Sequence, residues 1–163
     1  MTADHREEKS DPYRIRMTVG GDLIKCPGLT TSTTADTIAS KLLWNSTIST
    51  KNARYMCADV KNFYLNTPLD RPEYMRLALS IIPQEIIDQY KLESKAKNGQ
   101  VYIRIDKGMY GLPEAGRLAN DLLVTRLKPH GYYPVEHTHG LWRHTTRPVT
   151  FTLVVDDFGI KYV

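Results

Sequence analysis

The sequence of 163 residues is long enough for one domain with a hydrophobic core. Its hydrophobic content of 41% and charged content of 25% are typical of globular proteins, and no apolar run approaches the roughly 20 residues that cross a membrane. The net charge of +4 is compatible with a polyanionic partner but does not require one. The polar N-terminal residues lack the apolar centre of a signal peptide, so we expect an intracellular protein, cytoplasmic or nuclear, with no membrane partner.

The cysteines and histidines do not form a recognisable metal-binding pattern. Cys26 and Cys57 stand far apart and outside any CxxC spacing, so the sequence predicts neither a zinc site nor a disulfide framework. His137 and His139 form an H-x-H pair, but no partner cysteine or acidic cluster accompanies them. We expect these two histidines to face solvent in a loop.

The N-terminal half predicts a strand, a helix and a second strand. Residues 1–12 are expected to be a disordered lead-in, and the single folded unit is expected to span residues 13–163. The alternating stretch 13–19 predicts a strand that ends at a double glycine. Hydroxyl residues followed by apolar residues at helical spacing predict a helix over about 35–48. The β-rich stretch 54–65 predicts a buried strand that runs into a helical or turn segment.

The C-terminal half mixes short strands with two further helices. The expected strands are 73–79, 101–105, 140–146, 148–155 and 158–163. The expected helices are a short one over 83–92 and a longer one, with an apolar stripe, over 113–131. This pattern predicts an α+β fold in which an antiparallel sheet has its helices packed on one face.

Three aspartates at the ends of expected strands are the candidate catalytic residues. The apolar stretch LVVDDFG runs directly into Asp156 and Asp157, which taken alone also fits a solvent-exposed turn. Asp59 closes a second β-rich stretch, MCADV. Neighbouring ionised carboxylates repel each other unless a cation neutralises them, and Mg²⁺ prefers carboxylate oxygen. Asp59 and Asp156 therefore fit a two-metal phosphoryl-transfer site if the fold brings them together, which spacing alone does not establish.

Three segments occur in an order that suggests a family. They are ADVKNFYLNTPL (58–69), KGMYGLPEAG (107–116) and LVVDDFG (153–159). Together they resemble the palm motifs of the reverse transcriptase of a copia-type long-terminal-repeat retrotransposon, and the resemblance covers about residues 13–163. It implies a fingers-and-palm fold and RNA-directed DNA polymerase activity, with dNTP, an RNA or DNA template with its primer, and two Mg²⁺ ions as partners and cofactors.

The resemblance also implies roles for individual residues near the first and third motifs. Asp59 and Asp156 would be metal ligands, and Asp157 would be the supporting carboxylate. The backbone carbonyl of Val60 would also face a metal ion. Tyr64 would match the aromatic residue that packs under the incoming sugar and excludes a 2′-hydroxyl, although a tyrosine in the core explains it equally well.

The second motif and the N-terminal strand supply the remaining expected contacts. Tyr110 and Gly111 would line the nucleotide and template pocket, where glycine lets the backbone approach a ligand closely. Arg16 would grip the triphosphate through its forked guanidinium, or simply be a solvated strand arginine. Two positions depart from the family pattern, with Val154 in place of a tyrosine and Gly116 in place of a proline.

The position of the third motif near the end of the sequence leads to a further expectation. The last residue, Val163, comes six residues after Asp157, so we expect a partial reverse transcriptase domain that has fingers and palm but no thumb. Two alternatives remain open at this stage. One is a catalytically inactive remnant that binds nucleic acid through phosphate contacts and base stacking, and the other is a partly unfolded pseudogene product. The sequence does not indicate an oligomeric state.

Overall fold

The structure, a computed structural model, describes residues 2–5, 7–8, 12–26 and 28–163. In these residues the chain has an α+β fold in which all strand pairs are antiparallel. The strands are β1 (Thr2–His5), β2 (Tyr13–Arg16), β3 (Arg54–Asp59), β4 (Pro68–Ala78), β5 (Gln100–Lys107), β6 (Tyr132–Pro134), β7 (Leu141–His144), β8 (Val149–Val154) and β9 (Asp157–Tyr162). The α-helices are α1 (Thr37–Ile48), α2 (Gln84–Tyr90) and α3 (Ala115–Leu127).

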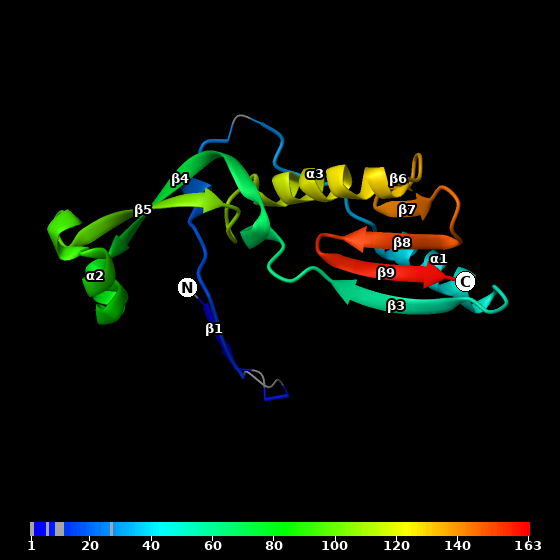
Figure 1. The fold of residues 1–163 in the computed structure, drawn as a ribbon, viewed down its shortest axis with the longest axis horizontal. Helices are drawn as coiled ribbons and strands as arrows, with labels where there is room; N and C mark the ends of the chain where they lie inside the picture. Colours follow the sequence, from blue (N-terminus) through cyan, green and yellow to red (C-terminus); the bar gives the residue numbers. More distant parts are fainter. Residues whose placement is uncertain (1, 6, 9–11, 27) are drawn as a thin grey trace.

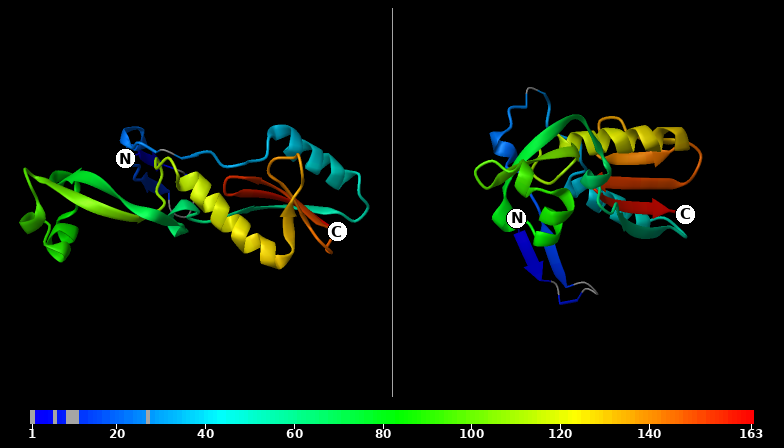
Figure 2. Two further views of the ribbon diagram at one scale, coloured as in Figure 1. Left: turned by 90° about the horizontal axis from the view of Figure 1, so that it is seen from above. Right: turned by 60° about the vertical axis from the view of Figure 1, so that its left-hand side comes forward.

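The largest sheet lies at one end of the elongated molecule and a long hairpin lies at the other (Figure 1). The sheet has the strand order β3-β9-β8-β7-β6, whereas β4 pairs only with β5 and β1 pairs only with β2. Helix α2 is carried by the β4–β5 hairpin, and α3 extends from the base of this hairpin toward the large sheet (Figures 1 and 2). The path of the chain therefore separates a sheet region from a hairpin region.

Helices α1 and α3 cover opposite faces of the large sheet, so the expectation that the helices pack on one face is wrong. Lys161 of β9 points to α1, where its Nζ donates to the backbone oxygen of Ser46 at 3.0 Å. The next residue toward the turn, Ile160, packs instead in the cluster that includes Leu123 and Leu127 of α3. Neighbouring residues of a strand point to opposite faces, which places one helix on each side. The views in Figure 2 agree with this arrangement.

Helix α1 begins where its sequence supplies a cap. The carboxylate of Asp36 accepts a hydrogen bond from the Ala39 amide at 2.6 Å, which satisfies one of the free amides of the first turn. Leu43 and Thr47 are buried against the sheet. At the far end Lys161 also donates to the hydroxyls of Ser46 and Thr50, at 2.6 and 2.8 Å. Both ends of the helix are thus fixed by polar contacts.

The face of the sheet toward α3 carries an aromatic core. Trp142, Phe151 and Leu153 are 4%, 3% and 1% exposed, and the Trp142 and Phe151 rings stack with their centroids 5.9 Å apart. The apolar stripe of α3 packs against this cluster. Burial of large side chains of this kind contributes about 1.5–3 kcal/mol each, so this cluster is the main source of stability for the sheet region.

The hairpin is longer than its sequence pattern predicts. The expected strand over 73–79 extends back to Pro68, with an irregularity between Pro68 and Glu73 before regular pairing with β5 resumes. One face of the hairpin contributes to a second small core, in which Ile105 of β5 packs with Leu112 and Ala115 near the start of α3.

The other expected elements are found with small changes at their ends. The N-terminal strand is shorter than its prediction, and the short helix and the last hairpin lie where they are expected. The expectation that residues 1–12 are disordered is wrong for Thr2–His5, which form β1 against β2. Residues 1, 6 and 9–11 of this stretch lie outside the described residues. Strand β6 was not expected, because three residues are too few to show a pattern. In the described part of the chain, no helix has the length and apolar character to cross a membrane.

Two glycines have nearly the same left-handed backbone conformation, but only one of them lies against the segment before α1. Gly140 and Gly99 have φ of +69° and +71°. A Cβ at Gly140 would overlap the backbone of Ala35 and Thr34, whereas a Cβ at Gly99 would meet nothing within 4 Å. We expect Gly99→Ala to lower the free energy of unfolding by about 1–2 kcal/mol, the usual cost of this backbone conformation. Gly140→Ala should cost about 2 kcal/mol more, since the segment before α1 must also move.

Chemical unfolding followed by circular dichroism measures both glycine variants. Equal losses would contradict the close approach, because the backbone strain is the same at the two positions.

Candidate functional site

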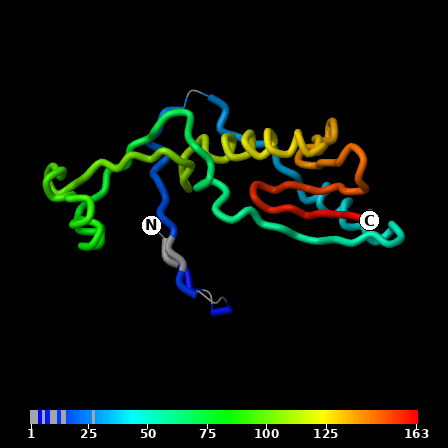
Figure 3. Tube along the Cα trace, in the orientation of Figure 1, coloured from blue at the N-terminus to red at the C-terminus, as the bar shows by residue number. Residues whose placement is uncertain are grey.

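The pairing of β3 with β9 brings two of the three aspartates together. The register of these antiparallel strands places Asp59 directly opposite Asp157. Figure 3 shows the two strands running side by side although they lie about a hundred residues apart in sequence. Directly opposite residues in an antiparallel pair have their Cβ atoms about 4.5–5.5 Å apart. Both side chains are exposed, so their charges face solvent at the edge of the sheet.

The third aspartate lies in the turn between β8 and β9. Val154 pairs with Asp157, which leaves Val155 and Asp156 as a two-residue loop. Val155 has φ of +59°, a conformation that favours glycine and is strained for a β-branched residue. The amide of Val60 donates to the backbone oxygen of Asp156 at 3.0 Å and ties this turn to the end of β3. The carbonyl of Val60, which we expected to face a metal ion, stays a prediction.

Partial burial and the two neighbouring carboxylates raise the pKa of Asp156. Partial burial is the largest cause, and the charges of Asp157 and Asp59 add to it because they disfavour a further negative charge nearby. A hydrogen bond with the Asp59 carboxyl also favours the protonated form of Asp156. The site therefore concentrates negative charge at one point, and a cation placed there would relieve the repulsion.

The donor atoms at this point fit Mg²⁺. In the described residues, no three histidine, cysteine or acidic side chains are arranged so that they could hold a metal ion by themselves. Mg²⁺ is commonly held by one or two carboxylates, with water and substrate phosphate as the other ligands. Asp59 and Asp156 match the carboxylate part of such a set. The expectation of two ions is not tested by this geometry.

The carboxylates of Asp59 and Asp157 open into a groove on the face of the sheet toward α1. The groove has a volume of about 390 Å³, which is in the range of ligand-binding clefts. Its floor includes Gly159, where an added Cβ would overlap the hydroxyl of Tyr55, and Thr152 lies beside it. Sequence reasoning identified Asp59 and Asp157 but not Tyr55, although the even spacing of Tyr55 and Asp59 along β3 is a signal that they share a face.

Two tyrosines and an arginine form a series of contacts between the β8–β9 turn and strand β2. Tyr64 follows the β3 motif, and its pKa is raised first by burial and then by the charge of Asp156 and the hydroxyl of Tyr110. The rings of Tyr64 and Tyr110 meet edge to face with centroids 5.2 Å apart. The guanidinium carbon of Arg16 lies 5.2 Å from the centroid of Tyr110, which is within cation–π range. The expected residues Asp156, Tyr64, Tyr110 and Arg16 thus form one connected series.

Two glycines in and beside the turn of the second motif (107–116) allow its backbone to pack closely against Val19 and Tyr64. Gly111 has φ of +93°, and a Cβ there would overlap the carbonyl oxygen of Val19, whose amide donates to the Tyr110 oxygen at 2.8 Å. A Cβ at Gly108 would lie 2.6 Å from the backbone oxygen of Tyr64. We expected the backbone at Gly111 to approach a ligand closely, and this stays a prediction. In the structure the close approach is to Val19 of the chain itself.

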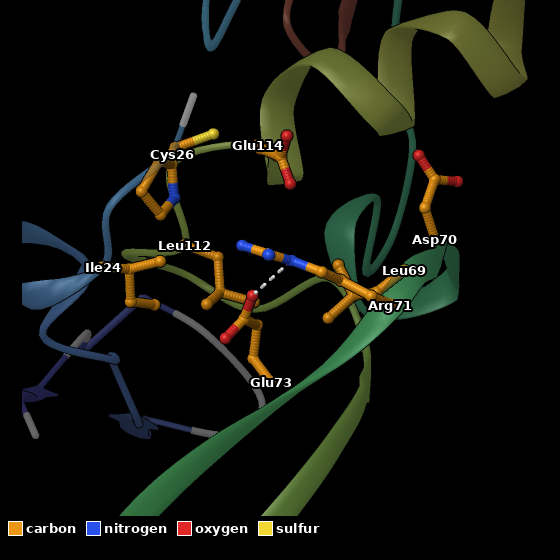
Figure 4. A pocket seen from close by; sticks show the side chains of 9 residues that line it. Ile24, Cys26, Leu69, Asp70, Arg71, Glu73, Leu112 and Glu114 are labelled. Carbon is orange, nitrogen blue, oxygen red and sulfur yellow. Dashed lines mark ion pairs between the residues drawn. The ribbon is translucent and has the colours of Figure 1, made fainter. Parts of the chain in front are cut away.

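A second concavity lies between the start of β4 and the start of α3 (Figure 4). The side chain of Arg71 crosses it and forms an ion pair with Glu73 at 3.1 Å. The cavity has a volume of about 10 Å³, which is the space of one water molecule. Cys26 lies at its edge as a free thiol. This concavity is too small to be a substrate site.

The remaining sequence candidates lie outside the carboxylate site or at its groove. His137 is almost fully exposed, and its Nε2 lies 3.5 Å from the neighbouring Glu136 carboxylate. His139 is also exposed, as expected for a loop. Cys57 is a free thiol that lines the groove beside Asp59.

No protein-family model, curated protein or solved structure matches this chain.

The raised pKa of Asp156 leads to a stability prediction. A carboxyl whose pKa is higher in the folded state destabilises the fold once the pH exceeds that pKa, and this cost disappears below the ordinary value of 3.8. We expect Asp156→Asn to raise the thermal unfolding midpoint at pH 7 in EDTA, and the gain to vanish as the pH falls below about 3.8.

Differential scanning fluorimetry over a pH series measures this effect. Asp70→Asn is the control, since it removes one carboxylate from an exposed position of β4. A gain at pH 7 that is equal in both variants would mean that overall charge, and not the aspartate cluster, is responsible.

Proposed function

We propose that this chain contains the fingers and palm of an RNA-directed DNA polymerase of the copia-type retrotransposon class. The observation that supports this most directly is the cross-strand pair of Asp59 and Asp157 beside the turn residue Asp156. Of the three segments that resemble reverse transcriptase motifs, the first and third pair through β3 and β9, and the second contacts the first through the rings of Tyr110 and Tyr64. In this reading the large sheet is the palm, and the hairpin region with the N-terminal strands belongs to the fingers.

In the proposed reaction a primer 3′-hydroxyl attacks the α-phosphate of a dNTP and displaces pyrophosphate. Asp59 and Asp156 would hold Mg²⁺, which activates the attacking oxygen and stabilises the leaving one in this type of site. Asp157 lies opposite Asp59 and adds negative charge that strengthens cation binding. The tight turn fixes the position of Asp156, and fixed charges are effective because they need no rearrangement during the reaction.

The aromatic series would position the nucleotide. Tyr64 lies close enough to Asp156 for the aspartate charge to raise its pKa, so a sugar packed on this ring would lie beside the carboxylates. Arg16 is exposed, and its forked guanidinium suits a triphosphate. Its contact with the Tyr110 ring orients the guanidinium without using its hydrogen-bond donors.

The two departures from the family pattern are compatible with this proposal. Val154 lines the groove next to Asp157 and is 39% exposed, so an apolar side chain replaces the usual tyrosine without removing a carboxylate. A Cβ at Gly116 would be 4.0 Å from Cε1 of Tyr64, an ordinary contact distance. Gly116 therefore leaves Tyr64 in place but lowers the intrinsic stability of the first turn of α3.

A second candidate function is nucleic-acid binding without catalysis. It is favoured by the net charge of +4, since cationic side chains contact the phosphates of nucleic acid. Binding of this kind would weaken with salt and would not respond to Mg²⁺ or dNTP.

Primer extension on an RNA template with Mg²⁺ and dNTP distinguishes the two functions. We expect Asp59→Asn and Asp156→Asn each to lower extension at least about 100-fold, because each removes a charge that stabilises the transferring phosphate. Binding of a fluorescent dNTP in Mg²⁺ provides a second measurement that does not depend on turnover. Asp70→Asn, at an exposed position, should leave both unchanged.

Two results would overturn the polymerase proposal. One is extension that is unaffected by the Asp59 and Asp156 substitutions. The other is a wild-type chain that binds template–primer but neither extends it nor binds dNTP in Mg²⁺, which would favour the second function.

A further inference from the structure

The β4–β5 hairpin carries two tyrosines and two arginines in alternation on one face. In the pairing register, Tyr74 lies opposite Arg104 and Arg76 lies opposite Tyr102. Residues two apart in a strand share a face, so all four side chains project from the same side of the hairpin. The tyrosines occupy one diagonal of this square and the arginines occupy the other.

This face is open to solvent, whereas the opposite face is partly covered. Tyr74 and Tyr102 are 62% and 68% exposed, and the two arginines are also exposed. On the opposite face, Val101 and Ile105 are 3% and 8% exposed. Two large aromatic rings on the open side cost hydrophobic free energy and contribute nothing to the core, which suggests a role in contact with a ligand.

We propose that this face of the β4–β5 hairpin binds single-stranded nucleic acid. Unpaired bases stack on aromatic rings whatever their sequence, and arginines beside the rings neutralise the phosphates that join the bases. Diagonal neighbours in an antiparallel pair are about 7–8 Å apart, so each tyrosine can take a separate base. A duplex keeps its bases stacked inside and cannot use the rings in this way.

Charge favours nucleic acid over an apolar protein segment as the occupant of this face. Both aromatic residues are tyrosines, and each lies opposite a cation, so the face has no continuous apolar area. Asp106 would compete with a phosphate for Arg104, because its carboxylate accepts a hydrogen bond from Nε of Arg104 at 2.7 Å. Both side chains of that pair are 61% exposed, and a pair of this kind is weak enough to exchange for a phosphate.

The proposed contact does not depend on the carboxylate site. The hairpin forms its own two-stranded sheet and extends away from the large sheet (Figure 1). Stacking and phosphate contacts need neither Mg²⁺ nor dNTP. The proposal can therefore fail while the polymerase proposal stands, and the reverse also holds.

The test measures binding of the wild-type chain to a fluorescein-labelled oligothymidylate of about 15 nucleotides, by fluorescence anisotropy in EDTA at low salt. We expect Tyr74→Ala combined with Tyr102→Ala to weaken binding at least about tenfold, and the two Phe substitutions to retain it, since Phe keeps the stacking surface. Arg76→Gln combined with Arg104→Gln should reduce the slope of log affinity against log salt by about 1.4, the value for two phosphates on a single strand.

The large sheet supplies a matched control. Tyr133 of β6 lies opposite Arg143 of β7, and both are exposed, so this pair has the same chemistry without the second alternating pair. Tyr133→Ala combined with Arg143→Gln should leave the affinity unchanged. Because cross-strand Tyr–Arg pairs also stabilise a hairpin, the unfolding midpoint of every variant is measured as well.

Several outcomes would overturn the proposal. One is that the wild-type chain does not bind the oligothymidylate. Another is that the folded variant with both Tyr74→Ala and Tyr102→Ala keeps the wild-type affinity. A third is that the Tyr133 and Arg143 control loses as much affinity as that variant. Equally tight binding of a duplex of the same length would show that the contact is electrostatic and not specific to single strands. Asp156→Asn should bind the oligothymidylate as the wild type does, which separates this test from that of the polymerase site.

Discussion

The pairing of β3 with β9 is the constraint on which the candidate site depends. Its register places Asp59 opposite Asp157, and a shift of one residue would turn every side chain of β3 to the other face. The burial of Phe151 and Leu153 in the adjacent strand β8, whose partners on β9 are Ile160 and Phe158, fixes the register of β8 against β9. The aromatic core toward α3 therefore sets the position of β9 and of Asp157, opposite which Asp59 of β3 lies.

The site itself works against stability. Asp59 and Asp157 face each other, and Asp156 adds a third carboxyl whose pKa is raised by burial and by the other two. Val155 adopts a backbone conformation that glycine tolerates better. These costs are concentrated within one turn and one strand end. A structural role for the turn would be better served by asparagine and glycine at its two positions. A cation bound beside Asp59 and Asp156, as in the proposed function, would neutralise these charges.

The sequence predicts the features of this structure that depend on neighbouring residues better than those that depend on contacts between distant segments. Hydroxyl residues followed by apolar residues at helical spacing predicted α1, and the stretch FGIKYV after the aspartate pair predicted the return strand. Which face each helix covers depends on tertiary packing, since apolar spacing shows that a helix has a buried side but not what it is buried against. The three aspartates were visible as strand ends, whereas the contact of Arg16 with Tyr110 joins segments nearly a hundred residues apart and leaves no trace in local pattern.

The hairpin and the carboxylate site are joined at their base. Strand β4 begins immediately after Thr67, whose backbone oxygen accepts a hydrogen bond from the Gly108 amide at 2.7 Å at the end of β5. The Thr67 amide in turn donates to the Tyr64 oxygen at 2.9 Å, and Gly108 is packed too closely against that carbonyl to carry a side chain. Both strands of the hairpin thus end at the backbone of Tyr64. A strand of nucleic acid held on the Tyr74–Tyr102 face would therefore lie on a hairpin whose base is hydrogen-bonded to the backbone of Tyr64.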